Sequence, residues 1–172
     1  LISNEVDLTH CMKYYVVIVH IVQTFKPSCE RFYIGDKSIL VFWSATSLIF
    51  GVDCSTKSMD LSYGAKPTTG IIYRMSKDVC LLSVAKLWEI LNEALKGTKK
   101  QDNEEVARLV CMYTCVKLFF STFGETIGWA FYSYMDPLDN MIEHDWAESI
   151  QATLMGSVGQ NWRKPRRVTG CV

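Results

Sequence analysis

The chain has 172 residues, 49% of them hydrophobic, and its 18 Lys and Arg residues balance its 18 Asp and Glu residues. This length suits one domain with one core, and the zero net charge excludes a global field that would draw the whole chain to nucleic acid or membrane. The seven scattered cysteines, an odd number set mostly among nonpolar neighbours, indicate reduced thiols in a nuclear or cytoplasmic protein rather than a secreted disulfide framework.

The N-terminal part predicts a helix, a hairpin and a second, short helix. Residues 6–25 favour a helix that ends before Pro27, although the β-branched run 16–19 also fits a strand. The most hydrophobic window, 14–22, is too short to span a membrane. Residues 30–42 predict a β-hairpin with its turn at Gly35, and residues 44–50 predict a helix that ends at Gly51.

The middle of the chain predicts a long loop and an amphipathic helix. The segment from Asp53 to Thr69 is rich in Ser, Thr, Gly and Lys and reads as an irregular loop, and loops of this length are often functional. Residues 76–78 introduce a helix over about 79–96, followed by a polar connector over 96–103. Its nonpolar stripe consists of Leu81, Val84, Leu87, Trp88, Leu91 and Leu95.

The clearest periodicity lies in residues 103–158. Asp102 or Asn103 is expected to cap a helix whose nonpolar side chains, between 106 and 120, cover nearly its whole circumference, so it should be buried on most sides. Residues 126–135 predict another helix, and a last helix should run from 139 or 140 to about Gly156. The predicted fold class is therefore mostly α with a small β-hairpin.

Several of these segments, in this order, resemble the plant mobile domain, also called the aminotransferase-like plant mobile domain. They are the hairpin with the short helix ending in Gly-Val (32–52), the buried helix, the segment MDPLDN at 135–140, the segment DWAESI at 145–150 and GCV at 170–172. The resemblance covers residues 25–172, and the segment around Trp146 is its most specific part. Two residues depart from the family pattern. The family usually has Thr or Ser at the position of Phe42 and often Asp at the position of Ala45.

This resemblance implies a nuclear plant protein of transposon origin, similar to proteins linked to transposon silencing and development. It implies a non-enzymatic domain with protein partners, phosphatase-like proteins among them. A related domain precedes Ulp1-like SUMO-protease domains, so the alternative is an accessory domain of a transposon-encoded protease whose catalytic part lies downstream. In the family, residues 170–172 would open a further helix, so we expect the single domain 1–172 to be a fragment.

Three groups of chemically active residues have structural interpretations that we favour. Cys111 and Cys115 are four residues apart on one helix but lack the two further ligands of a structural zinc site, so we expect core packing. The side chains of the triplet 143–145 (Glu-His-Asp) would point in three different directions from a helix, so they cannot converge on one substrate atom. We expect them to supply charge at the start of a helix. Cys171 resembles the nucleophile of Ulp1-like proteases, but residues 166–169 lack their oxyanion Gln. We therefore predict no catalytic residue, metal or cofactor.

One basic cluster remains as a candidate binding patch. Four cations next to an indole can pair with phosphates while the ring stacks on a base, so the cluster predicts a nucleic-acid contact or a nuclear-import signal. A solvated connector fits the same residues. The cluster consists of Trp162, Arg163, Lys164, Arg166 and Arg167.

Overall fold

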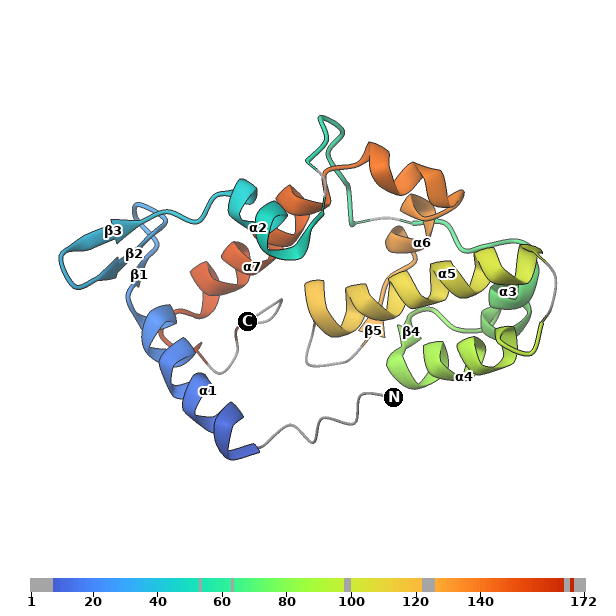
Figure 1. The fold of residues 1–172 in the computed structure, drawn as a ribbon, viewed down its shortest axis with the longest axis horizontal. Helices are drawn as coiled ribbons and strands as arrows, with labels where there is room; N and C mark the ends of the chain where they lie inside the picture. The colour runs from blue at the N-terminus through green and yellow to red at the C-terminus, as the bar shows by residue number, and fades with distance from the viewer. Residues whose placement is uncertain are drawn as a thin grey trace.

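The structure, a computed structural model, describes residues 8–52, 54–62, 64–97, 100–121, 126–165 and 168, with side-chain surroundings for all of these except 8–14 and 100–102. Helices dominate the described residues, which also form one three-stranded and one two-stranded antiparallel sheet. Figure 1 shows two lobes side by side, with the small three-stranded sheet at one end. This architecture confirms the predicted fold class, mostly α with a small β-hairpin.

The first lobe combines the N-terminal part of the chain with its last helix, which lies against α2 (Figure 1). Its elements are α1 (Leu8–Gln23), β1 (Phe25–Lys26), β2 (Arg31–Ile34), β3 (Lys37–Ile39), α2 (Trp43–Phe50) and α7 (Trp146–Asn161).

The second lobe consists of the middle of the chain, and in it α4 packs along α5 (Figure 1). Its elements are α3 (Gly70–Ser76), β4 (Leu82–Ser83), α4 (Val84–Ala94), α5 (Lys100–Thr114), the π-helical turn η1 (Cys115–Phe119), β5 (Thr126–Ile127), α6 (Ala130–Tyr134) and the 3-10 helix η2 (Leu138–Glu143).

The hairpin and the two N-terminal helices form, but the second strand of the hairpin ends at Ile39 instead of residue 42, and Phe25, predicted to end the first helix, belongs to β1. β2 pairs with β3 around Gly35, whose φ of 62° is the left-handed conformation that glycine adopts without strain. α1 ends at Gln23, before Pro27. α2 ends at Gly51, whose N–H donates to the carbonyl of Ser47, and it forms although Phe42 provides no side-chain cap. β1 is a third strand that the sequence did not predict.

The helix predicted over 79–96 is shorter than expected, because its first residues belong to a sheet. Leu82 and Ser83 pair with β5, and the hydroxyl of Ser83 accepts the N–H of Lys86 at 3.1 Å, so α4 starts at Val84. Ser76, predicted to introduce this helix, is the last residue of α3. The helix predicted over 126–135 is wrong in its first half for the same reason, since Thr126 belongs to β5.

Two other predicted boundaries also differ. α5 begins at Lys100, ahead of the predicted caps, because Lys and Gln are good helix formers and extend the helix toward the N-terminus. The last helix begins at Trp146 rather than at 139 or 140, since the Asp145 carboxylate accepts the N–H of Glu148 at 2.8 Å and caps it. It continues through Gly156 to Asn161.

The buried side chains form two hydrophobic clusters, whereas one core was expected. The large cluster fills the second lobe and extends to the start of α7; it includes Leu87, Leu109, Met112 and Ile150. The small cluster lies in the first lobe, between the sheet, α1 and α7, and its buried members are Val22, Phe25, Phe32 and Val158.

The predicted nonpolar stripe of α4 is only partly buried. Leu87 and Leu91 lie in the large cluster, but Leu81, Trp88 and Leu95 are exposed, and Ile90 takes the central buried position instead. The helix over 106–120, expected to be buried on most sides, is buried or partly buried at most of its positions, and α3, α4 and α6 all pack against α5. Val110, Lys117 and Leu118 are its exposed residues, and its last turn is the π-helical η1.

Two leucines at the ends of α4 provide a test of this packing. Leu87 is 1% exposed, whereas Leu95, just after the helix, is 60% exposed. We expect Leu87→Ala to lower the free energy of unfolding by about 2–5 kcal/mol, since it leaves a cavity, and Leu95→Ala to change it by less than about 0.5 kcal/mol. Urea denaturation followed by circular dichroism measures both. Equal losses would contradict the arrangement of α4.

Candidate functional site

The structure describes Trp162, Arg163 and Lys164 of the predicted basic cluster, while Arg166 and Arg167 lie outside the described residues. The indole of Trp162 is partly buried and packs against the small cluster. The guanidinium carbon of Arg163 lies 4.8 Å from the centre of its ring. The ring therefore contributes to packing, and Arg163 and Lys164, both exposed, are the described groups of this segment best placed to contact a partner.

The long loop predicted over 53–69 is irregular, as expected, at all its described residues; Asp53 and Tyr63 lie outside them. Several contacts hold it to the second lobe. The Tyr134 hydroxyl accepts the N–H of Asp60 at 2.7 Å and donates to its carbonyl at 2.8 Å. The carbonyl of Lys57 accepts the N–H of Asp145 at 2.9 Å, and the hydroxyl of Ser55 donates to the carbonyl of Glu143. The loop is therefore tied down at several points along its length.

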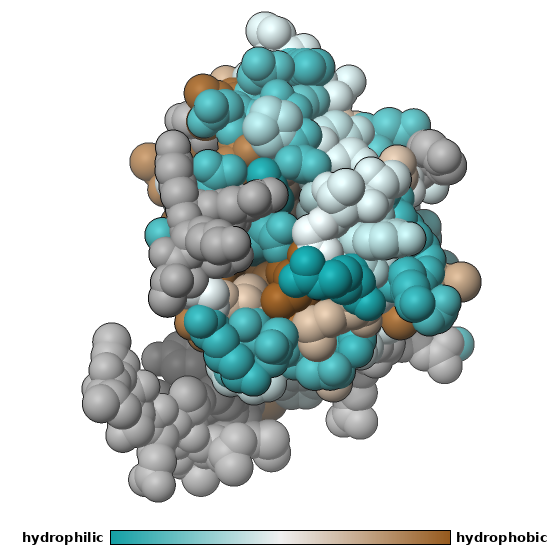
Figure 2. Space-filling view, turned by 90° about the vertical axis from the view of Figure 1, so that its right-hand side faces the viewer, coloured by the Kyte–Doolittle hydropathy of each residue, from teal (hydrophilic) through white to brown (hydrophobic). Residues whose placement is uncertain are grey.

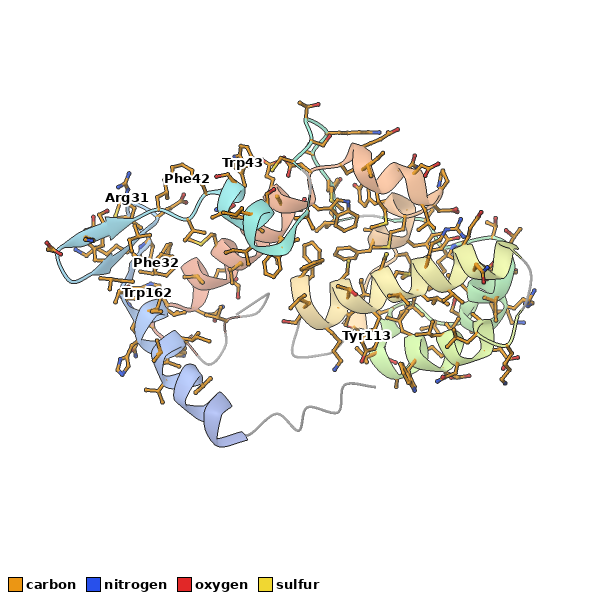
Figure 3. The ribbon with its side chains drawn as sticks, viewed as in Figure 1. Arg31, Phe32, Phe42, Trp43, Tyr113 and Trp162 are labelled. Atoms are coloured by element: carbon orange, nitrogen blue, oxygen red, sulfur yellow. The ribbon has the colours of Figure 1, made fainter. Side chains whose placement is uncertain are left out.

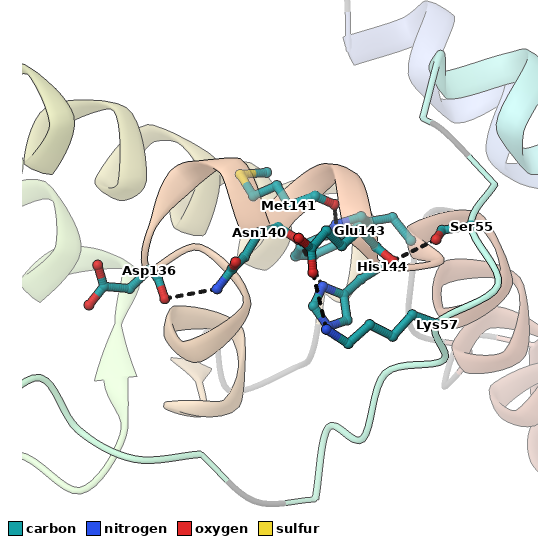
Figure 4. Close-up of polar contacts among 8 residues, drawn as sticks. Ser55, Lys57, Asp136, Asn140, Met141, Glu143 and His144 are labelled. Atoms are coloured by element: carbon teal, nitrogen blue, oxygen red, sulfur yellow. Dashed lines mark hydrogen bonds and ion pairs between the residues drawn. The ribbon is translucent and has the colours of Figure 1, made fainter.

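The residues Glu143, His144 and Asp145 each have a separate partner and do not converge on a common point, in agreement with the sequence interpretation. Figure 4 shows the partners of Glu143 and His144. Glu143 pairs with Lys57 at 3.2 Å through two well-exposed side chains, which contributes little. His144 is buried, and its Nδ1 lies 2.8 Å from the carbonyl oxygen of Asn140. Only Asp145 is a helix cap. The triplet joins loop 53–69 to the start of α7.

The cysteine pair lies at an apolar pocket. Cys115 is buried and Cys111 half-buried, and burial raises the pKa of both thiols, so neither is an activated nucleophile. The pocket of 270 Å³ lies between η1, η2 and the start of α7, where Phe119, Met141 and Trp146 line it. Among the described residues, no group of three or more His, Cys, Asp or Glu side chains could hold a metal ion.

A polar network lies at the other side of the large cluster. Arg108, largely buried, forms an ion pair with Asp136 at 3.0 Å and donates from Nε to the carbonyl of Met135 at 3.1 Å. The hydroxyl of Tyr132 donates to the other carboxylate oxygen of Asp136 at 3.1 Å. Burial, with a smaller effect of the Asp136 charge, raises the pKa of Tyr132 to about 12. This network holds α5 to the end of α6.

The feature that the sequence interpretation missed is an exposed nonpolar surface on α2. Leu48 and Ile49 are 86% and 73% exposed, and Phe42 and Trp43 at the start of the helix are also exposed. We call these four residues the apolar edge; Figure 3 shows Phe42 and Trp43 along one border of the molecule. Three consecutive nonpolar residues, 48–50, could have indicated it, because they cannot all face one core from a helix.

The opposite end of the molecule has a different surface. Figure 2 views the end that bears α3 and α4, and it is mostly hydrophilic with smaller hydrophobic areas between. Among the described helices, none is both long enough and nonpolar enough to cross a membrane.

The chain gives no match to models of known protein families, to curated proteins or to solved structures. The resemblance to the plant mobile domain therefore stays a prediction, and the functional argument depends on the surfaces described above.

The tyrosine that holds loop 53–69 can be tested directly. We expect Tyr134→Phe to speed hydrogen exchange of the Asp60 amide about tenfold or more, since that N–H loses its acceptor. Tyr73→Phe, on an exposed ring of α3, is the matched control and should leave the same amide unchanged. The exchange rate of the Asp60 amide in the two variants is measured by NMR or mass spectrometry. Equal rates in both variants would show that the loop is held elsewhere.

The raised pKa of Tyr132 predicts a loss of stability at high pH. Its hydroxyl ionises near pH 10 in the unfolded chain but only at about 12 in the folded chain, so the folded state holds the proton more tightly and stability falls as pH rises through this window. The Tyr132→Phe variant lacks the hydroxyl group that carries this proton. We therefore expect a smaller loss of unfolding free energy between about pH 9 and pH 11 in the variant than in the unaltered protein, measured by urea denaturation. A parallel loss in both would contradict the prediction.

Proposed function

We propose that this chain is a non-enzymatic protein-interaction domain that acts in the nucleus and binds a partner through the apolar edge. The observation that supports this proposal is the exposure of Leu48 and Ile49, two large aliphatic side chains that lie almost entirely in water. Burying each against a partner would contribute about 1.5–3 kcal/mol. The resemblance to the plant mobile domain supports the nuclear setting and the expectation of protein partners.

The apolar edge has the composition of a binding hot spot. It combines two aromatic side chains, Phe42 and Trp43, with two aliphatic ones, and tryptophan is among the residues that contribute most to protein interfaces. Residues 38–52 contain no charged residue. The partner surface that fits such a chemistry is nonpolar, for example the apolar face of an amphipathic helix, rather than an acidic or basic segment.

The apolar edge is held firmly from behind. α2 packs along α7, and the Gln151 side chain donates from Nε2 to the carbonyl of Val41 at 3.0 Å, just before the helix. The hydroxyl of Ser47 donates to the carbonyl of Val52 at 2.7 Å, just after it. A surface fixed at both ends loses little conformational entropy when it binds, which favours affinity.

A paired variant tests this proposal. We expect L48S/I49S to lose specific partners in a pull-down from plant nuclear extract, because the substitution removes the nonpolar contact area and leaves the core unchanged. L81S/L95S is the matched control, since it replaces two exposed leucines of the second lobe. Quantitative mass spectrometry of the recovered proteins compares the two.

Two outcomes would contradict the proposal. The first is a set of recovered proteins that is the same for both double variants. The second is self-association, seen by sedimentation velocity, that L48S/I49S abolishes while no other protein is recovered; the apolar edge would then join two copies of the chain.

A further inference from the structure

The charge of this neutral chain is divided unevenly between its two lobes. By sequence, residues 8–52 and 146–165, which form the first lobe, carry six Lys and Arg against three Asp and Glu, a net charge of +3. Residues 53–145 carry ten against thirteen, a net charge of −3. A local excess of positive charge attracts polyanions even when the whole chain is neutral.

The three-stranded sheet presents its cations on one face. Phe32 of β2 is buried in the small cluster, and since successive residues of a strand point to opposite faces, its neighbours Arg31 and Tyr33 point away from the core. Lys26 pairs with Arg31, and Ser38 pairs with Tyr33, so both share that face. We call Lys26, Arg31, Tyr33 and Ser38 the outer sheet face; all four are exposed.

One cation of the outer sheet face lies over an aromatic ring, and the other bonds to the neighbouring strand. The Lys26 ammonium lies 4.2 Å from the centre of the Tyr33 ring, which is 38% exposed. Arg31 donates from Nη1 to the hydroxyl of Ser38 at 3.2 Å, on the neighbouring strand. Neither cation forms an ion pair with another described residue, so neither charge is neutralised by a carboxylate there. A base that stacked on this face of the Tyr33 ring would displace the Lys26 ammonium, which could then pair with a phosphate.

The end of α7 adds positive charge at the same end of the molecule, next to the inner side of the sheet. Trp162 packs against the small cluster, which contains Phe25 and Phe32 on the inner side of the sheet. The sheet and Arg163 and Lys164, which follow Trp162, therefore belong to one end of the molecule, and Figure 3 shows Arg31 and Trp162 there. Residues distant in the sequence thus contribute positive charge to one end of the molecule.

We propose that the outer sheet face binds single-stranded nucleic acid, with a base stacked on Tyr33 and neighbouring phosphates held by Lys26 and Arg31. Stacking platforms flanked by cations are the general means by which proteins bind single strands. An acidic peptide would use the two cations but not the ring, and the bases of a duplex are already stacked on one another. The combination of ring and cations therefore favours a single strand.

Fluorescence anisotropy with labelled oligonucleotides of about 20 nucleotides tests this proposal at salt concentrations between about 50 and 200 mM. Single-stranded DNA, single-stranded RNA and duplex DNA form three arms, and we expect either single strand to bind more tightly than the duplex. Tyr33→Leu, which keeps the nonpolar bulk, should weaken binding about tenfold through lost stacking. K26Q/R31Q should reduce the slope of log affinity against log salt by about 1 to 2.

K77Q/K96Q provides the matched control, because it removes the same charge from two exposed lysines of the second lobe. The proposal is overturned if this control weakens binding as much as K26Q/R31Q does, or if the duplex binds most tightly. It is also overturned if Tyr33→Leu binds like the unaltered protein and a polyglutamate peptide competes as well as the single strand. Circular dichroism melting checks that each variant is folded. If K26Q/R31Q is unfolded, the comparison of Tyr33→Leu with the unaltered protein decides alone.

Discussion

One helix, α7, is shared by the two hydrophobic clusters, and the rest of the structure depends on it. Trp146 and Ile150 near its start belong to the large cluster, whereas Val158 near its end belongs to the small one. At 1.5 Å per residue, the first and last of these side chains leave the helix about 18 Å apart. A single rigid rod therefore joins the two lobes, and the α2 helix that packs on it takes its position from both.

The start of α7 is fixed by polar contacts as well. Asp145 accepts the N–H of Glu148 through its carboxylate and donates its own N–H to the carbonyl of Lys57, so one residue caps the helix and holds loop 53–69. The indole of Trp146 donates to the carbonyl of Met141 at 2.8 Å. Residues that suggest a catalytic triplet in the sequence thus serve as a joint between the lobes, because each finds a separate partner.

The first lobe carries two surfaces of opposite chemistry close together in the chain. The apolar edge contains no charge, while the outer sheet face combines two cations with a tyrosine. The first suits a nonpolar protein surface and the second a polyanion with exposed rings. Because the sheet and α2 both lie against α7, a protein partner and a nucleic acid could contact the same lobe without competing for the same side chains.

Local chemistry made the hairpin, the short helix and the loop 53–69 predictable, since Gly35, Gly51 and the Ser-rich composition act within a few residues of themselves. The start of α4 was not predictable, because Leu82 and Ser83 pair with Thr126 and Ile127, far along the chain. The periodicity of residues 81–95 is real, but only tertiary packing decided that Leu87 is buried and Leu95 is not. Sequence by itself determined the fold class and the basic cluster at 162–167. The apolar edge, and the sheet that faces solvent with Lys26, Arg31 and Tyr33, were decided by the tertiary structure, because which face of an element is covered depends on segments remote in sequence.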